Sequence, residues 1–167
     1  MRRSLAGMRS RRRDEAGVTL IELVCVTAIV LVLAGMALPV ANTFVKRQRE
    51  MELRQALRVM RLAIDRFHAD VQKIPSMRQS KMNAVNEDGY PEKLEWLYEG
   101  YDIGDAARTR LKYLRRLPRD PITGKREWGT RSSRDRPGAN FSDEINIFDV
   151  HSKSEAVALD GTKYVDW

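Results

Sequence analysis

The chain has 167 residues, which leaves room for one globular domain beside a membrane-spanning segment. Its single cysteine, Cys25, excludes an intramolecular disulfide. The formal net charge is +7, but residues 1–17 hold six arginines and two acidic residues, so the rest of the chain is near +3 and its charge does not favour nucleic acid as a partner.

An apolar run extends from Val18 to Val45, and Glu22 is its only formal charge. As a helix rising about 1.5 Å per residue, the run spans roughly 42 Å. This length is sufficient to cross a hydrocarbon core of about 30 Å. A carboxylate inside such a helix costs free energy and is usually kept for pairing or function. The arginines that precede the run predict a cytoplasmic N-terminus. The run therefore predicts a single-pass membrane helix in which Glu22 has a role.

The sequence from Gly17 to Leu23, GVTLIEL, resembles the cleavage and methylation motif of type IV pilins and of the pseudopilins of type II secretion systems. In that family a prepilin peptidase cuts after the glycine, the new amino terminus is methylated, and a glutamate is the fifth mature residue. The resemblance implies processing between Gly17 and Val18 and an assembly role for Glu22. Val18 departs from the usual Phe or Met. A plain membrane anchor is the alternative, but it would need neither the glycine nor the acid.

Gly35 and Pro39 predict a kink in the membrane helix, because proline removes one internal hydrogen bond and clashes with the preceding turn. From residue 46 the composition is polar, without Gly or Pro until Pro75, so the helix is expected to continue. An apolar stripe at spacings of three and four predicts one buried face. A coiled coil is the alternative. The stripe consists of Leu53, Leu57, Met60, Ile64, Phe67 and Val71.

Pro75 is expected to end the long helix, with a loop over 76–89. Pro91 and Gly100 predict the start and end of a short helix, and a second one is expected over 105–114. Thr123-Gly124 is a turn signal. Strands are expected over 126–132 and 145–152. Asp160-Gly161 is expected to close a last hairpin before Tyr164 and Trp167 return to the core.

The segment Arg116-Leu-Pro-Arg-Asp-Pro121, followed by a glycine turn, is similar to one that introduces the C-terminal sheet of major pseudopilins. The resemblance implies an α+β, type IV pilin-like fold, in which a long N-terminal helix packs on a small antiparallel sheet. The expected organisation is a cytoplasmic leader (1–17), a transmembrane and assembly helix (18–45), its amphipathic continuation (46–74) and a globular domain (75–167).

Major pseudopilins bind calcium through acidic side chains, a serine and backbone carbonyls, the oxygen ligands that this cation requires. The corresponding region holds Ser152, Asp160 and Asp166, so the resemblance implies calcium as a candidate cofactor there. The family's Gly-Ala-Asp-Gly stretch is absent, and Asp160-Gly161 is equally well explained as a turn. No grouping of residues predicts an enzyme.

Three functions remain open. The first is a type II secretion pseudopilin held in the bacterial inner membrane, with its C-terminal domain in the periplasm, and then polymerised into a periplasmic filament. Its implied partners are prepilin peptidase, copies of itself, minor pseudopilins, the inner-membrane assembly platform and membrane lipid. The second is a major or minor type IV pilin of a surface filament. The third is a DNA-uptake minor pilin that uses Arg131, Arg134 and Arg136 against phosphate.

Overall fold

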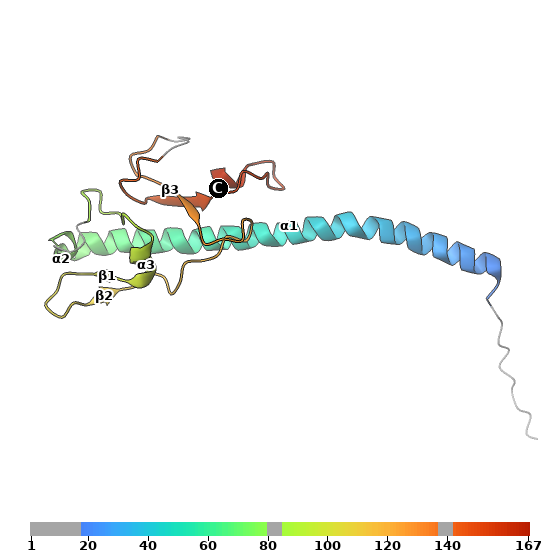
Figure 1. Cartoon of the computed structure of the whole chain (residues 1–167), viewed down its shortest axis with the longest axis horizontal. Helices are drawn as coiled ribbons and strands as arrows, with labels where there is room; N and C mark the ends of the chain where they lie inside the picture. Colours follow the sequence, from blue (N-terminus) through green and yellow to red (C-terminus); the bar gives the residue numbers. More distant parts are fainter. Residues whose placement is uncertain (1–17, 80–84, 137–141) are drawn as a thin grey trace, which may run out of the picture. The chain divides into compact units, whose positions relative to one another are not determined.

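The structure is a computed structural model that describes residues 18–79, 85–136 and 142–167 (Figure 1). The chain divides into two compact units, Met1–Asn42 and Thr43–Trp167. The elements in chain order are α1 (Leu20–Lys73), α2 (Pro75–Gln79), α3 (Glu95–Glu99), β1 (Tyr101–Asp102), β2 (Arg110–Leu111), β3 (Trp128–Arg131), β4 (Asp149–Ser152) and the 3₁₀ helix η1 (Tyr164–Asp166). A long N-terminal helix with a small antiparallel β region confirms the expected α+β, pilin-like fold.

Helix α1 begins where its sequence supplies a cap. The hydroxyl of Thr19 accepts a hydrogen bond from the backbone N–H of Glu22 at 3.2 Å, and the carbonyl of Thr19 accepts one from Leu23 at 3.1 Å. Threonine is a favoured N-cap because it satisfies one of the unpaired amides of the first turn. At its other end, α1 stops at Lys73 before Pro75. Proline suits a first helical position, so Pro75 starts α2. The prediction of a loop from residue 76 was therefore wrong over 76–79.

The predicted stripe on α1 forms the centre of the core in the second unit. All six of its side chains are buried. Around Phe67 the rings of Trp96, Tyr101 and Tyr113 lie at centroid distances of 6.3, 5.1 and 5.5 Å. The stripe therefore packs against elements of its own chain, as expected from its spacing.

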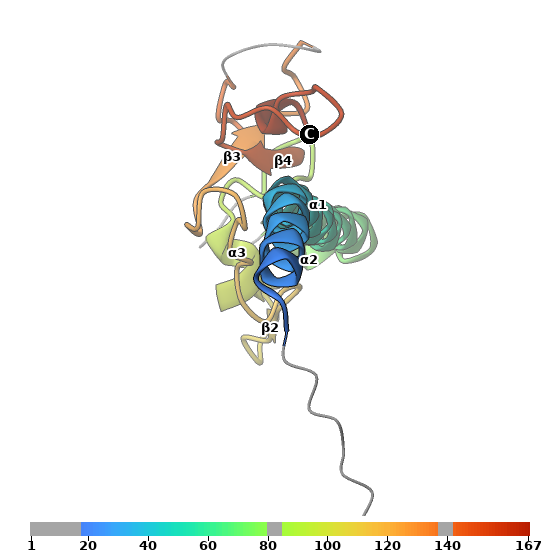
Figure 2. The same cartoon turned by 90° about the vertical axis from the view of Figure 1, so that its right-hand side faces the viewer.

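Two separate two-stranded antiparallel sheets lie on opposite sides of the globular half of α1, as both views show (Figures 1 and 2). Strand β3 pairs with β4 so that Trp128 faces Ser152 and Arg131 faces Asp149. Both strands lie inside the ranges predicted from the sequence, although each is shorter. Strands β1 and β2 pair through Tyr101 with Leu111 and Asp102 with Arg110. The sequence did not predict this second sheet.

The helix expected from Pro91 starts four residues later, at Glu95. The carbonyl of Pro91 accepts a hydrogen bond from the N–H of Ile147 at 2.7 Å, so this tertiary contact takes the place of a helical bond. The end of the helix was predicted correctly, because Gly100 follows it with a positive φ of 103°.

The helix expected over 105–114 was wrong, because this segment contains a turn and β2. The carboxylate of Asp105 accepts hydrogen bonds from the backbone N–H and hydroxyl of Thr109 at 2.7 and 2.6 Å. These bonds lower the pKa of Asp105. An aspartate whose side chain bonds a nearby backbone N–H in this way offers the chain an alternative to a helix.

The expected turns at Gly124 and Gly161 are both present. Asp120 is buried beneath the first turn, where its carboxylate accepts hydrogen bonds from the N–H of Ile122 and the hydroxyl of Ser152, both at 2.7 Å. The second turn joins an isolated antiparallel bridge between Val157 and Lys163. Tyr164 then returns to the core, as predicted.

Candidate functional site

The apolar segment of α1 has large hydrophobic side chains that are exposed. Val18 is 69% exposed, and the large apolar side chains through Leu33 for which burial is described are all exposed. α1 is also the one helix of the described residues that is long and apolar enough to cross a membrane. Apolar surface of this extent is stable only against lipid or another protein. The segment is therefore the first part of the candidate site.

Glu22 lies in the first turn of this segment. Its backbone N–H is used by the cap at Thr19, but within the described residues its carboxylate accepts no hydrogen bond and forms no ion pair. The hydroxyl of Thr27, further along the segment, is satisfied inside the helix, because it donates to the carbonyls of Leu23 and Val24 at 2.9 and 3.0 Å. Glu22 thus differs from Thr27 in having no partner for its polar group in the described part of the chain.

The roles predicted for the remaining residues of this segment stay predictions. Gly17 lies outside the described residues, as does the rest of the leader 1–17. α1 continues as a helix through both Gly35 and Pro39. A Cβ added at Gly35 would meet no atom within 4 Å. Among the described residues, this position therefore has no close neighbour that would require glycine.

Polar side chains on the first turns of the globular half of α1 hold the C-terminal residues. Lys46 donates to the carbonyl of Val157 at 2.7 Å. Glu50 is buried, and its Oε1 accepts bonds from the N–H of Leu159 at 2.8 Å and the hydroxyl of Tyr164 at 3.0 Å. Burial and this bond to Glu50 raise the pKa of Tyr164 to about 12. The C-terminal hairpin is therefore attached to the helix by its backbone as well as by its core side chains.

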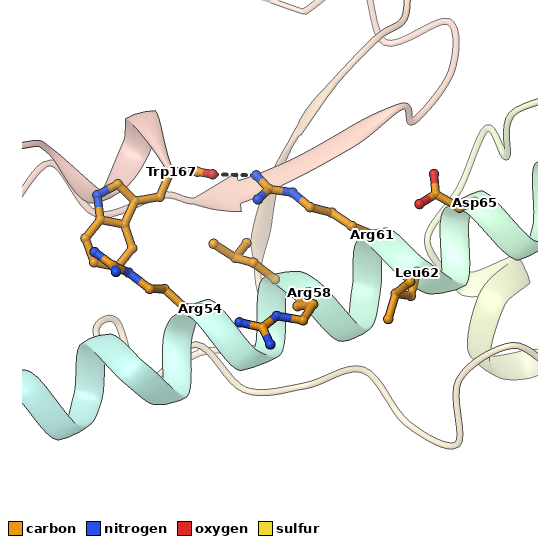
Figure 3. A pocket seen from close by; sticks show the side chains of 7 residues that line it. Arg54, Arg58, Arg61, Leu62, Asp65 and Trp167 are labelled. Carbon is orange, nitrogen blue, oxygen red and sulfur yellow. Dashed lines mark hydrogen bonds between the residues drawn. The ribbon is translucent and has the colours of Figure 1, made fainter.

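Two arginines extend this attachment. Arg54 forms an ion pair with Asp160 at 3.3 Å and lies 4.3 Å from the centroid of the Trp167 ring, a distance suited to a cation–π contact. Arg61 contacts both oxygens of Asp149 at 2.6 and 3.2 Å and the carbonyl of Val150 at 3.3 Å. It also donates to the backbone oxygen of Trp167 (Figure 3).

These arginines line a cavity of about 510 Å³ between α1 and the C-terminal residues (Figure 3). Its lining consists of Arg54, Leu57, Arg58, Arg61, Leu62, Asp65 and Trp167. Sequence reasoning missed Glu50 and Arg61 as anchors of the fold. Glu50 could have been found, because it lies three residues before Leu53 and continues the spacing of the apolar stripe.

Replacing Arg61 with alanine is expected to lower the free energy of unfolding by about 2–3 kcal/mol, because it leaves Asp149 without its charged partner and frees two backbone oxygens. Arg58→Ala is the matched control: Arg58 lines the same cavity but has no ion pair in the described residues. Its loss should change stability by less than about 0.5 kcal/mol. Denaturant unfolding of both variants measures the difference, and equal midpoints would remove Arg61 as an anchor.

Two of the three residues named for calcium are held by other partners. The hydroxyl of Ser152 donates to Asp120, and Asp160 accepts bonds from Thr162 at 3.0 and 2.6 Å besides its ion pair with Arg54. Asp166 lies in η1. Among the residues that the structure describes, no group of three His, Cys, Asp or Glu side chains could hold a metal ion. These side chains do not fit a calcium site as they are arranged, and calcium binding stays a prediction.

Two of the three arginines named for DNA contact the protein itself. Arg134 forms an ion pair with Asp88 at 2.9 Å, and Arg131 donates to the carbonyl of Val165 at 3.1 Å. Arg136 is exposed. A phosphate-binding surface built on these three residues would therefore compete with contacts that hold the fold.

Comparison with known families identifies one match, the prokaryotic N-terminal methylation motif, over residues 12–38. This range contains Gly17, Val18 and Glu22 together with the apolar part of α1 through residue 38. No curated protein and no solved structure matches the chain. The motif implies processing by prepilin peptidase and assembly into pilus-like polymers, and the apolar helix that follows it suggests membrane anchoring. Together with the fold, it indicates a type IV pilin-like protein.

Proposed function

We propose that the protein is a structural subunit of a type II secretion pseudopilus, which prepilin peptidase processes and which polymerises from the inner membrane to drive protein export. The observation that carries the proposal is the exposed apolar segment of α1, in which Glu22 has no charged partner among the described residues. A subunit that moves from lipid into a filament keeps such a segment covered at both stages. A globular protein that works alone would gain nothing from it.

In this proposal, the charge of the leader supports an orientation of the chain across the membrane. The leader has a net charge of +4 and stays in the cytoplasm by the positive-inside rule. Gly17 then lies at the cytoplasmic edge of the membrane, where the peptidase cuts, and residues 46–167 lie in the periplasm. The same orientation holds for every copy, so subunits enter the filament with their α1 helices parallel.

Cleavage supplies the partner that Glu22 lacks. Removing residues 1–17 creates a positively charged amine at Val18. In lipid, an isolated carboxylate is costly, but a filament can bring the amine of one copy beside the Glu22 carboxylate of another. A buried charge is tolerated when it is paired. Methylation of the amine would keep its charge, so this pairing does not depend on it.

Two features support a pseudopilin over a pilin with a disulfide-closed loop. The lone cysteine lies in the apolar part of α1, and no second one exists to pair with it. The segment resembling that of major pseudopilins, residues 116–121, is also built into the fold. It places Asp120 under β4 and the carbonyl of Pro118 3.1 Å from the indole nitrogen of Trp128.

The mass of the protein extracted from membranes tests the proposal. The expected product begins at Val18, with or without a methyl group, and a Gly17→Val variant should keep its leader. A product that begins at Met1, or one cut beyond residue 45, would contradict the processing step. Visible fibres outside the cell, with normal processing, would favour a surface pilin instead.

A further inference from the structure

Two neighbouring segments of the second unit carry opposite charge. Residues 86–105 hold seven acidic residues and one basic residue, whereas residues 110–126 hold seven basic residues and one acidic residue. The single acid of the basic segment, Asp120, is buried and bonded to Ser152, so it neutralises none of the surface arginines. The two segments therefore have net charges of opposite sign.

The basic surface is hollowed. Four exposed arginines line a cavity of about 610 Å³ beside Val59 of α1, which is 43% exposed. These residues, Arg115, Arg116, Arg119 and Arg126, are called the basic groove here. None of them forms an ion pair with a carboxylate in the described ranges, although Arg119 donates to the carbonyl of Gly124. Four guanidinium groups without a carboxylate partner around an open cavity attract an acidic partner.

The acidic surface is formed by exposed residues of α3 and of the segment just before it. Glu92, Glu95 and Glu99 are spaced by three and four residues, and all three are exposed. They are called the acidic face here. As far as the structure describes the chain, none of them forms an ion pair either. Each surface thus has the charge that the other lacks, and neither is neutralised within one subunit.

The two surfaces lie at different levels along α1. The basic groove lies beside Val59, which lines the same cavity. By contrast, α3 packs beside Phe67 through Trp96. Eight helical residues separate these positions by roughly 12 Å. Figure 1 shows the same displacement: α3 lies nearer the C-terminal end of α1 than does the segment that leads into β3. In parallel copies, the acidic face of one subunit can therefore meet the basic groove of the next.

We infer that the basic groove binds the acidic face of a second copy of this chain, and that this contact joins successive subunits of the filament. The inference rests on the proposed function, because that function supplies parallel copies. Two different surfaces in contact make a head-to-tail interface, which continues as an open filament instead of closing into a dimer. Charge complementarity between these two surfaces of the same molecule points to a second copy as the partner.

Charge exchange within one chain tests this contact. The groove variant Arg115→Glu/Arg116→Glu and the face variant Glu95→Arg/Glu99→Arg should each reduce filament yield by roughly tenfold or more, because like charges then oppose each other. A chain with all four substitutions should regain filaments, since the pairing is restored with its signs reversed. Arg136→Glu/Lys153→Glu is the control, because it changes the charge as much as the groove variant does, at exposed residues outside the groove.

Normal yield from either reversed variant would overturn the contact. So would failure of the fourfold chain to recover, which would indicate that the groove binds a different anion, such as a lipid headgroup. A Glu95→Cys/Arg116→Cys chain in a Cys25→Ser background adds a direct measurement. Oxidation should produce a ladder of linked copies that neither single cysteine produces, and absence of the ladder would also overturn the contact.

A different measurement, the mass of the processed protein, shows whether the proposed function is wrong. Every variant should begin at Val18 by mass, since the substitutions lie far along the chain from the processing site. If the wild-type protein begins at Met1, the proposed function is wrong whatever the cross-links show. A ladder in processed protein that forms surface fibres would support the contact and contradict only the assignment to secretion.

Discussion

Glu22→Ala is expected to leave the protein in the membrane but to abolish its filaments. Alanine is more favourable in lipid than a carboxylate, so insertion should be unchanged or improved. In the filament, however, the amine of Val18 would be buried without its partner. Removing one member of a buried ion pair costs about 3–5 kcal/mol, which corresponds to a loss of affinity of more than roughly a hundredfold per subunit. Membrane fractionation and electron microscopy measure the two outcomes.

The matched control is Thr27→Ala, in the same apolar segment. Because the hydroxyl of Thr27 is already bonded to Leu23 and Val24 inside the helix, its loss should leave filaments intact. Normal filaments from Glu22→Ala would remove the assembly role, and equal defects in both variants would show that the segment tolerates no change.

Glu22 could also act only at the start of α1, since Thr19 and Glu22 have the spacing of a capping box. Thr19→Ala separates this explanation from pairing. It removes the bond between the Thr19 hydroxyl and the N–H of Glu22, at a cost of about 1 kcal/mol, while leaving the carboxylate in place. Pairing predicts that Thr19→Ala still forms filaments, whereas a capping role predicts the same defect in both variants.

Phe67→Ala is expected to lower the free energy of unfolding of the globular unit by about 3–5 kcal/mol. The ring is fully buried and contacts three aromatic rings from α3, β1 and the segment after β2. Alanine would leave a cavity between the helix and all three of these segments, which the short strands cannot close. Thermal unfolding of the full chain in detergent, followed by near-ultraviolet circular dichroism, measures the change.

Leu62→Ala provides the comparison on the same helix. Leu62 is 49% exposed, so its truncation removes little buried surface and should cost less than about 1 kcal/mol. If the two variants unfold at the same temperature, the aromatic cluster does not hold the second unit together.

The sequence predicted the parts of this protein that depend on local composition. Crossing a bilayer requires only length and hydropathy, so the apolar run and the isolated charge of Glu22 could be recognised without any tertiary contact. The stripe from Leu53 to Val71 was equally clear, because its spacing depends on helical geometry alone. Strands β3 and β4 were found approximately, since β-forming residues alternate between turn signals there.

Tertiary contacts decided the rest. The carbonyl of Pro91 pairs with Ile147, more than fifty residues away, and this contact moved the start of α3. A turn held by Asp105 allowed residues 110–111, where a helix was expected, to pair with β1 as strand β2. Glu50 and Arg61 became anchors only because residues 149–167 fold back onto α1. Lipid acts on each residue of a segment through its local polarity, whereas these bonds depend on which distant groups the folded chain brings together.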